Sequence, residues 1–82
     1  MKLLYFAKIR EILDRSDETI SLPPNILSAG DLIEYLMDLD DIYKTAFGDK
    51  RFLIAADEEF VEMDFIIKNS KEIAIFPPVT GG

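Results

Sequence analysis

The 82-residue sequence contains no cysteine and no histidine. Without cysteine the chain has no disulfide framework, no thiolate nucleophile and no thiolate zinc site, and without histidine it lacks the commonest general base and metal ligand. The segment Ser28-Ala29-Gly30-Asp31 has a single glycine and departs from the glycine-rich pattern that binds nucleotide phosphates. We therefore expect that this chain is not an enzyme on its own and binds no metal and no cofactor.

Basic residues are also scarce. Nine Lys and Arg stand against sixteen Asp and Glu, which gives a net charge of −7. This charge repels the phosphates of nucleic acids and of anionic membranes. No apolar run approaches the roughly 20 residues that a membrane-spanning helix needs, and no segment resembles a signal peptide. We expect a soluble, cytoplasmic protein whose partners are other proteins, especially those with basic surfaces.

The pattern of apolar residues predicts a single domain that mixes strands and helices. A chain of this length buries only about 60 to 65% of the surface that it exposes when unfolded, so one core is expected. Alternating or continuous apolar segments predict strands over residues 2–9, 18–22, 52–56, 60–62 and 71–76. The first and the last of these carry apolar side chains on both faces. Either both faces of the sheet are covered within the domain, or one of them meets a partner.

The middle of the chain predicts the main helix, over residues 29–39. Ser28 offers an N-cap oxygen, and Asp31 three residues later completes a capping-box pattern. The expected buried stripe consists of Ala29, Leu32, Ile33, Leu36 and Leu39. Residues 42–47 predict a short second helix or a packed loop, and residues 10–13 a short helical turn. The order β-β-α-β-β predicts an α+β roll, with a mixed sheet of four or five strands packed on one main helix.

The final residues, Phe76-Pro77-Pro78-Val79-Thr80-Gly81-Gly82, form the most informative segment. Two prolines fix φ and remove two backbone donors, so neither a sheet nor a helix can continue after Phe76. We expect a folded domain over residues 1–76 and an extended tail over residues 77–82. The terminal glycines make a tip thin enough to enter a narrow tunnel in another protein. The terminal carboxylate is then the expected functional group, although a frayed, inert tail is the simpler alternative.

Both ends of the sequence resemble one known family. Residues 3–11, Leu-Leu-Tyr-Phe-Ala-Lys-Ile-Arg-Glu, and residues 72–82, Glu-Ile-Ala-Ile-Phe-Pro-Pro-Val-Thr-Gly-Gly, are similar to the small, sulfur-carrying subunits of molybdopterin synthase. The similarity extends along the whole chain, and the ending is its most specific part. The implied fold is the ubiquitin-like β-grasp, which agrees with the α+β order expected from the residues.

The resemblance also implies a function. In this family an E1-like enzyme uses ATP to adenylate the terminal glycine, and delivered sulfur converts it to a thiocarboxylate. The large subunit of molybdopterin synthase then takes up the tail, and the sulfur is transferred to cyclic pyranopterin monophosphate in molybdenum cofactor biosynthesis. By this resemblance the chain is a non-catalytic sulfur donor. Its partners are the large subunit and the activating enzyme. ATP is used by the activating enzyme and is not bound by this chain.

The family resemblance assigns roles to particular residues. Gly82 corresponds to the modified glycine, and Gly81 to the slim neighbour needed for tunnel entry. The remaining tail residues are Pro77, Pro78, Val79 and Thr80. The family places an exposed apolar patch against both partners, and its positions correspond to Phe6, Phe60 and Phe76 in this sequence.

Arg10 matches a recurrent family arginine, which implies a polar anchor beside the tail. Simpler alternatives exist for these side chains. The three aromatic rings could fill the core, since small domains bury most of their phenylalanine. Arg10 could form a surface ion pair with Glu11 or Asp14.

Three other functions remain open from the sequence. A sulfur carrier for thiamine thiazole synthesis shares the fold and the terminal Gly-Gly, although such carriers are usually shorter and lack the Phe-Pro-Pro-Val run. A ubiquitin-like modifier would be joined to lysines of other proteins by isopeptide bonds. A plain interaction domain would leave its tail unmodified.

Overall fold

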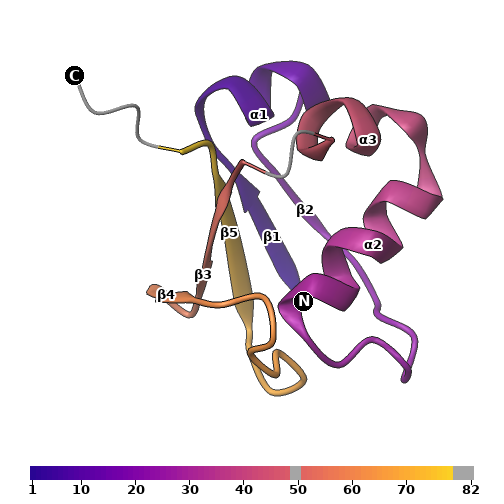
Figure 1. The fold of residues 1–82 in the computed structure, drawn as a ribbon, viewed down its shortest axis with the longest axis vertical. Coiled ribbons are helices and arrows are strands. Elements are labelled where there is room, and N and C mark those ends of the chain that lie inside the picture. Colours follow the sequence, from indigo (N-terminus) through magenta and orange to yellow (C-terminus); the bar gives the residue numbers. More distant parts are fainter. Residues whose placement is uncertain (49–50, 79–82) are drawn as a thin grey trace.

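The computed structural model describes residues 1–48 and 51–78, which form one five-stranded mixed sheet and three helices (Figure 1). The strands are β1 (Lys2–Tyr5), β2 (Asp17–Thr19), β3 (Leu53–Ala56), β4 (Glu59–Val61) and β5 (Glu72–Phe76), and the helices are α1 (Ala7–Leu13), α2 (Ala29–Leu39) and α3 (Asp41–Phe47). The strand order is β2-β1-β5-β3-β4. β1 and β5 are parallel, and the other neighbouring pairs are antiparallel. Figure 1 shows α2 and α3 on one face of the sheet and α1 at the end where β1 and β5 finish.

The core lies between the sheet and the helices, and β5 is its central strand. Successive side chains of a strand point to opposite faces, so Ile73 and Ile75 share one face while Ala74 and Phe76 share the other. Both isoleucines are fully buried in the cluster that also contains Leu32 of α2. Phe76, on the other face, remains only half-buried. One face of the sheet is therefore packed by helices and the other is open.

The main helix begins and ends where the sequence predicts. The Ser28 hydroxyl oxygen accepts a hydrogen bond from the Asp31 backbone N–H at 3.1 Å, and the Asp31 carboxylate accepts one from the Ser28 N–H at 3.1 Å. This capping box satisfies two donors at the first turn of α2. Four residues of the predicted stripe are buried, but the prediction for Leu39 is wrong, since 55% of it is exposed. α2 ends there, and the extended Asp40 turns the chain into α3.

The prediction of a single strand over residues 2–9 is wrong beyond Tyr5. Phe6 still has an extended backbone, but Ala7 has φ of 51°, in the left-handed region. That conformation reverses the chain into α1, a helix of seven residues where the sequence suggests only a short turn over 10–13. The expectation of one main helix and one short helix is therefore corrected to three helices in the described part of the chain.

The topology confirms the predicted α+β, β-grasp class. β2 is an antiparallel edge strand, shorter than the predicted 18–22, and the following Ile20 and Leu22 pack against the core. Pro77 and Pro78 belong to no helix or strand, whereas the predicted tail residues Val79, Thr80, Gly81 and Gly82 lie outside the described residues. Within residues 1–48 and 51–78, none of the helices has the length and apolar character to cross a membrane.

Candidate functional site

Three phenylalanine rings meet on the open face of the sheet. Phe6 and Phe76 stack with ring centroids 4.4 Å apart and planes inclined by 6°, and Phe60 lies against Phe76 at 5.7 Å and 55°. We call these three rings the aromatic patch. None of them belongs to the buried core, and 69% of Phe60 is exposed, so the alternative that they fill the core is wrong. They border a hollow of about 370 Å³ that is also lined by Leu4, Ala55, Glu58, Glu72 and Ala74.

Backbone hydrogen bonds explain why these rings meet although they are far apart in sequence. The parallel pairing of β1 with β5 places Tyr5 opposite Ile75. Phe6 extends this pairing by one residue, because its N–H donates a hydrogen bond to the Ile75 carbonyl at 3.3 Å. The ring of Phe6 therefore lies beside that of Phe76. On the other side of β5, the antiparallel hairpin of β3 and β4 brings Phe60 to the same face.

The turn between β3 and β4 is tied to the start of β5. Asp57 and Glu58 have φ of 48° and 74°, the left-handed pair typical of a two-residue hairpin turn. The Asp57 carboxylate accepts hydrogen bonds from the backbone N–H groups of Lys71 and Glu72, each at 3.0 Å. These bonds fix the hairpin that carries Phe60 against the strand that carries Phe76.

A second feature lies where the chain leaves β5. α1, α3 and the two prolines enclose a groove of about 570 Å³, which we call the tail-root groove. Ile9, Ile12 and Ala46 supply apolar surface, and the lining also includes Lys8, Thr45, Arg51, Pro77 and Pro78. The aromatic patch and the tail-root groove therefore border the same end of β5.

Arg10 lies in the last turn of α1 and is exposed. Within the part of the chain that the structure describes, it forms no ion pair with Glu11 or Asp14, so that alternative is wrong. Its backbone N–H donates to the Phe6 carbonyl at 3.3 Å, which ties the start of α1 to the aromatic patch. The structure therefore groups Phe6, Phe60 and Phe76 closely, with Arg10 one helical turn away from Phe6.

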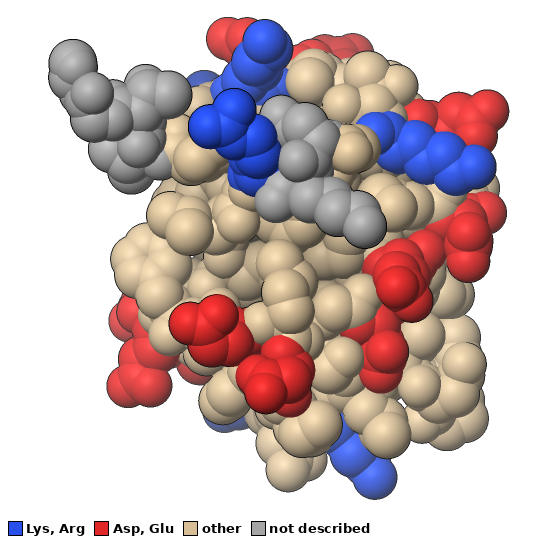
Figure 2. All heavy atoms as spheres, in the orientation of Figure 1, with Lys and Arg blue, Asp and Glu red and all other residues tan. Residues whose placement is uncertain are grey.

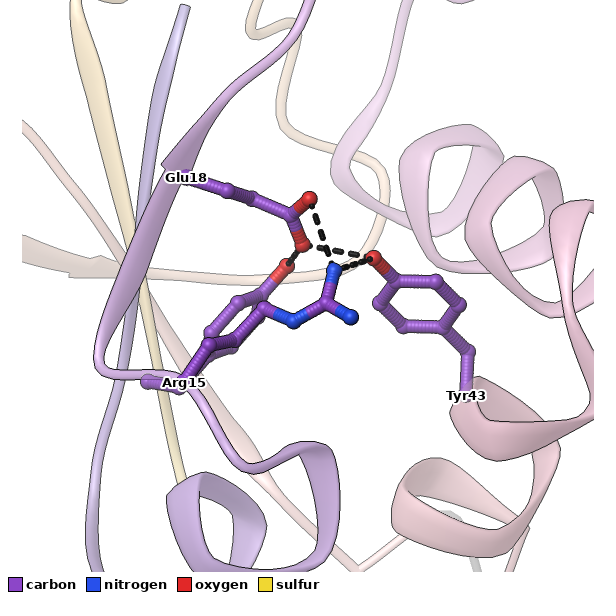
Figure 3. Close-up of polar contacts among 4 residues, drawn as sticks. Arg15, Glu18 and Tyr43 are labelled. Carbon is purple, nitrogen blue, oxygen red and sulfur yellow. Dashed lines mark hydrogen bonds and ion pairs between the residues drawn. The ribbon is translucent and has the colours of Figure 1, made fainter.

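A polar cluster that sequence reasoning missed lies on the helix-covered side (Figure 3). The Glu18 carboxylate accepts hydrogen bonds from the hydroxyls of Tyr5 at 2.5 Å and Tyr43 at 2.6 Å. Arg15 donates to Glu18 and to the Tyr43 oxygen, both at 3.1 Å. No sequence spacing signals this cluster, because its members come from β1, β2, α3 and the loop before β2.

The electrostatics of this cluster fit a structural role. Burial alone would raise the pKa of Glu18, but hydrogen bonds from Tyr43 and Tyr5 and the charge of Arg15 outweigh it and hold that pKa below its ordinary value. Burial and the neighbouring carboxylate raise the pKa of the Tyr5 and Tyr43 hydroxyls. At neutral pH one ionised carboxylate is therefore held by neutral phenols and a cation, and it joins β2 to α3.

Among the described residues, no group of three or more acidic side chains is arranged to hold a metal ion. In the described residues, the candidate site is thus an aromatic surface and a groove at the root of a tail. Such an arrangement can bind another protein and direct the tail towards it.

The chain is similar in sequence and in fold to known proteins. Residues 3–82 match the ThiS family. The molybdopterin synthase sulfur carrier subunit of Haemophilus influenzae is 32% identical over 82 residues, covering 100% of this chain and 99% of that protein. The subunit of the same name from Escherichia coli is 29% identical over 82 residues, with the same coverage. The crystal structure of SAMP1 from Haloferax volcanii has a similar fold, with a TM-score of 0.77 and 22% sequence identity. The match covers 100% of this chain and 98% of the SAMP1 chain.

Proposed function

Because this chain belongs to the ThiS family, we propose that it is the sulfur carrier subunit of molybdopterin synthase in molybdenum cofactor biosynthesis. The similarity to proteins of that name extends over the full length of this chain. The observation that supports it is structural: the aromatic patch lies on the open face of the sheet and includes Phe76, the last residue of β5, which directly precedes Pro77 and Pro78. A partner that covers the patch therefore receives the tail at the same time.

The chemistry that we propose takes place at Gly82. A carboxylate resists attack by nucleophiles because its charge is delocalised over two oxygens. Attack of one carboxylate oxygen on the α-phosphorus of ATP, held by an E1-like enzyme, releases pyrophosphate and leaves an acyl adenylate. A hydrosulfide equivalent from a sulfurtransferase then displaces AMP, which departs with one carboxylate oxygen. The product is a thiocarboxylate, and the large synthase subunit uses its sulfur on cyclic pyranopterin monophosphate.

In these steps the folded domain binds the partner proteins and orients the tail towards them. The absence of cysteine and histidine leaves the chain without the residues that usually act as nucleophile or general base. The exposed rings supply apolar area to bury against a partner, and aromatic side chains are enriched among the residues that dominate binding energies. In this proposal, the activating enzyme and the large subunit bind the aromatic patch in turn, and each acts on the tail.

Mass spectrometry of the intact chain tests the proposal. The chain is incubated with the E1-like enzyme of the same organism, ATP and a sulfur donor. We expect the exchange of one oxygen for sulfur, followed by loss of that sulfur when the large subunit and cyclic pyranopterin monophosphate are added. Deletion of Gly82, or Gly82→Ala, should abolish transfer, while circular dichroism shows an unchanged fold.

Other outcomes would identify other functions. A sulfur-loaded chain that the large subunit cannot unload would contradict the role in molybdopterin synthesis and favour a thiamine-type carrier. Covalent ladders on other proteins would favour a protein modifier. Full transfer activity of the chain lacking Gly82 would contradict the proposal altogether.

A further inference from the structure

The hollow bordered by the aromatic patch exists because its floor is made of small side chains. Ala55 of β3 lies opposite Ala74 of β5, and neither alanine belongs to the core cluster. Phe60 of β4 continues this row beyond Ala55, and Leu4 of β1 continues it beyond Ala74. Two methyl groups between larger side chains leave a depression of about 370 Å³. That volume is near the lower limit of the roughly 300 to 1,000 Å³ of small-ligand sites, so it suits one inserted side chain.

The two ends of the hollow differ in chemistry. Alternate residues of β5 point to the open face, which places Glu72, Ala74 and Phe76 in line along it. The stacked rings of Phe6 and Phe76 border the end nearest the tail. Glu58 and Glu72 line the other end, where β5 begins. In Figure 2, likewise, a group of Lys and Arg side chains lies over the end of the sheet where β5 finishes, and most acidic side chains of this face lie over the lower half and the right side.

The carboxylates of Glu58 and Glu72 have no positive partner within the domain. Among residues 1–48 and 51–78, no ion pair involves either of them. This holds although Lys2 lies opposite Glu72 in the strand register and Lys71 directly precedes it. A protein that fills the hollow removes water from these carboxylates, and burying a carboxylate is strongly unfavourable unless a cation pairs with it. The occupant must therefore combine apolar surface with positive charge.

We propose that the hollow receives one arginine side chain from each protein that covers the aromatic patch. The inference rests on the proposed function, which brings the activating enzyme and the large subunit to this patch in turn. The aliphatic part of the arginine lies on Ala55 and Ala74, and its guanidinium reaches Glu58 and Glu72. Arginine fits better than lysine, because its planar, weakly hydrated guanidinium stacks on aromatic rings and pairs bidentately with carboxylates. A purely apolar side chain would leave both carboxylates unpaired.

Neutralising the two carboxylates tests the charge that this inference requires. We compare Glu58→Gln combined with Glu72→Gln against a matched control, Glu34→Gln combined with Asp38→Asn, which changes the net charge equally. Glu34 and Asp38 are exposed on α2, which covers the other face of the sheet (Figure 1). We expect the hollow variant to bind both partner proteins about tenfold more weakly at low ionic strength, with a smaller difference at high salt. The control should stay within about threefold of the wild type.

Filling the hollow tests its shape. Ala74→Leu places a larger side chain on the floor without changing the charge, so we expect the affinity for both proteins to fall by about tenfold or more. Thermal unfolding of each variant shows whether a weak binder is still folded. If Ala74→Leu does not fold, the test is carried by the variant with Glu58→Gln and Glu72→Gln, which alters only side chains at the rim.

Arginine-specific labelling identifies the inserted residue. Phenylglyoxal modifies accessible guanidinium groups, and mass spectrometry compares each partner protein free and in complex with the wild-type chain. We expect one arginine of the partner to be protected in the complex. Replacing that arginine by methionine should weaken binding to the wild type by about tenfold. It should have little further effect on binding to the chain with Glu58→Gln and Glu72→Gln, because both changes remove the same interaction.

The outcomes separate this inference from the proposed function. If the wild-type chain acquires no sulfur and binds neither protein, the proposed function fails and the hollow inference fails with it. If sulfur is exchanged but Phe60→Ala weakens neither complex, the hollow inference alone is overturned. It is also overturned if Phe60→Ala weakens a complex that neutralisation of Glu58 and Glu72 leaves unchanged, or if no arginine is protected.

Discussion

The two faces of the sheet carry apolar side chains in similar number but meet different surroundings. On the covered face, Ile73 and Ile75 of β5 are fully buried against the helices. On the open face, Phe76 of the same strand is half-buried, and 69% of its neighbour Phe60 is exposed. The helices α2 and α3 lie on one face of the sheet (Figure 1). The covered face therefore stabilises the domain, and the open face is the one that we propose another protein covers.

The largest expected effect comes from a truncation on the covered face. Ile75→Ala removes a fully buried side chain from the central strand and leaves a cavity, so we expect the free energy of unfolding to fall by about 2 to 5 kcal/mol. The whole domain is expected to be stable by only about 4 to 12 kcal/mol, so this loss is a large fraction of it. Urea denaturation followed by circular dichroism measures the change.

Ile66→Ala is the matched control for that truncation. It makes the same chemical change at a residue that is 58% exposed, and it should alter the free energy of unfolding by no more than about 0.5 kcal/mol. Equal losses in the two variants would contradict the division of the molecule into a core face and an open face.

The covered side also holds the Glu18 cluster, and its removal should have the next largest effect. Glu18→Gln keeps the size of the side chain but removes the charge that holds Tyr5, Tyr43 and Arg15, so we expect a loss of about 1 to 3 kcal/mol at pH 7. The pKa of Glu18 is lowered in the folded state, so the unfolded chain binds its proton first as the pH falls. The stability that Glu18 contributes is therefore fully present above its unfolded pKa, about 4.3, and is lost as the pH falls through the lower pKa of the folded state.

Urea denaturation of both proteins between pH 7 and pH 3 measures this dependence. The difference in stability between wild type and Glu18→Gln should be constant near neutral pH and should shrink in the acid range, where the wild-type carboxyl becomes protonated. A difference that stays constant down to pH 3 would mean that packing, and not the charge of Glu18, holds β2 to α3.

Local signals in the sequence explain why the covered face could be predicted well. The Ser28 and Asp31 capping box fixes the start of α2, and the alternation in β5 fixes which of its side chains are buried. The family resemblance predicts the aromatic patch, and the alternation of β5 supports it by placing Phe76 on the face opposite to Ile73 and Ile75. These inferences depend on short-range patterns that the fold preserves.

The missed features depend on contacts between distant segments. The apolar run through Ile9 favours a strand, and only the positive φ at Ala7 breaks it into a strand and a helix. Leu39 continues the helical spacing, but no element lies over it after the chain turns into α3. Glu18 and Tyr43 are 25 residues apart, and nothing in their spacing indicates a hydrogen bond.

The smallest effect on stability, and the clearest separation of the two faces, is expected from Phe60→Ala. Most of this ring is exposed and it makes only a tilted contact with Phe76, so the free energy of unfolding should change by less than about 1 kcal/mol. Binding to the large subunit should nevertheless weaken by about tenfold or more, because buried aromatic anchors carry much of the energy of an interface.

Phe65→Ala is the matched control, since Phe65 is also exposed but lies outside the aromatic patch, beside the start of α2. Calorimetric titration of both variants with the large subunit measures the affinities. Equal affinities for the two variants would show that the open face is not the docking surface, even if the chain carries sulfur.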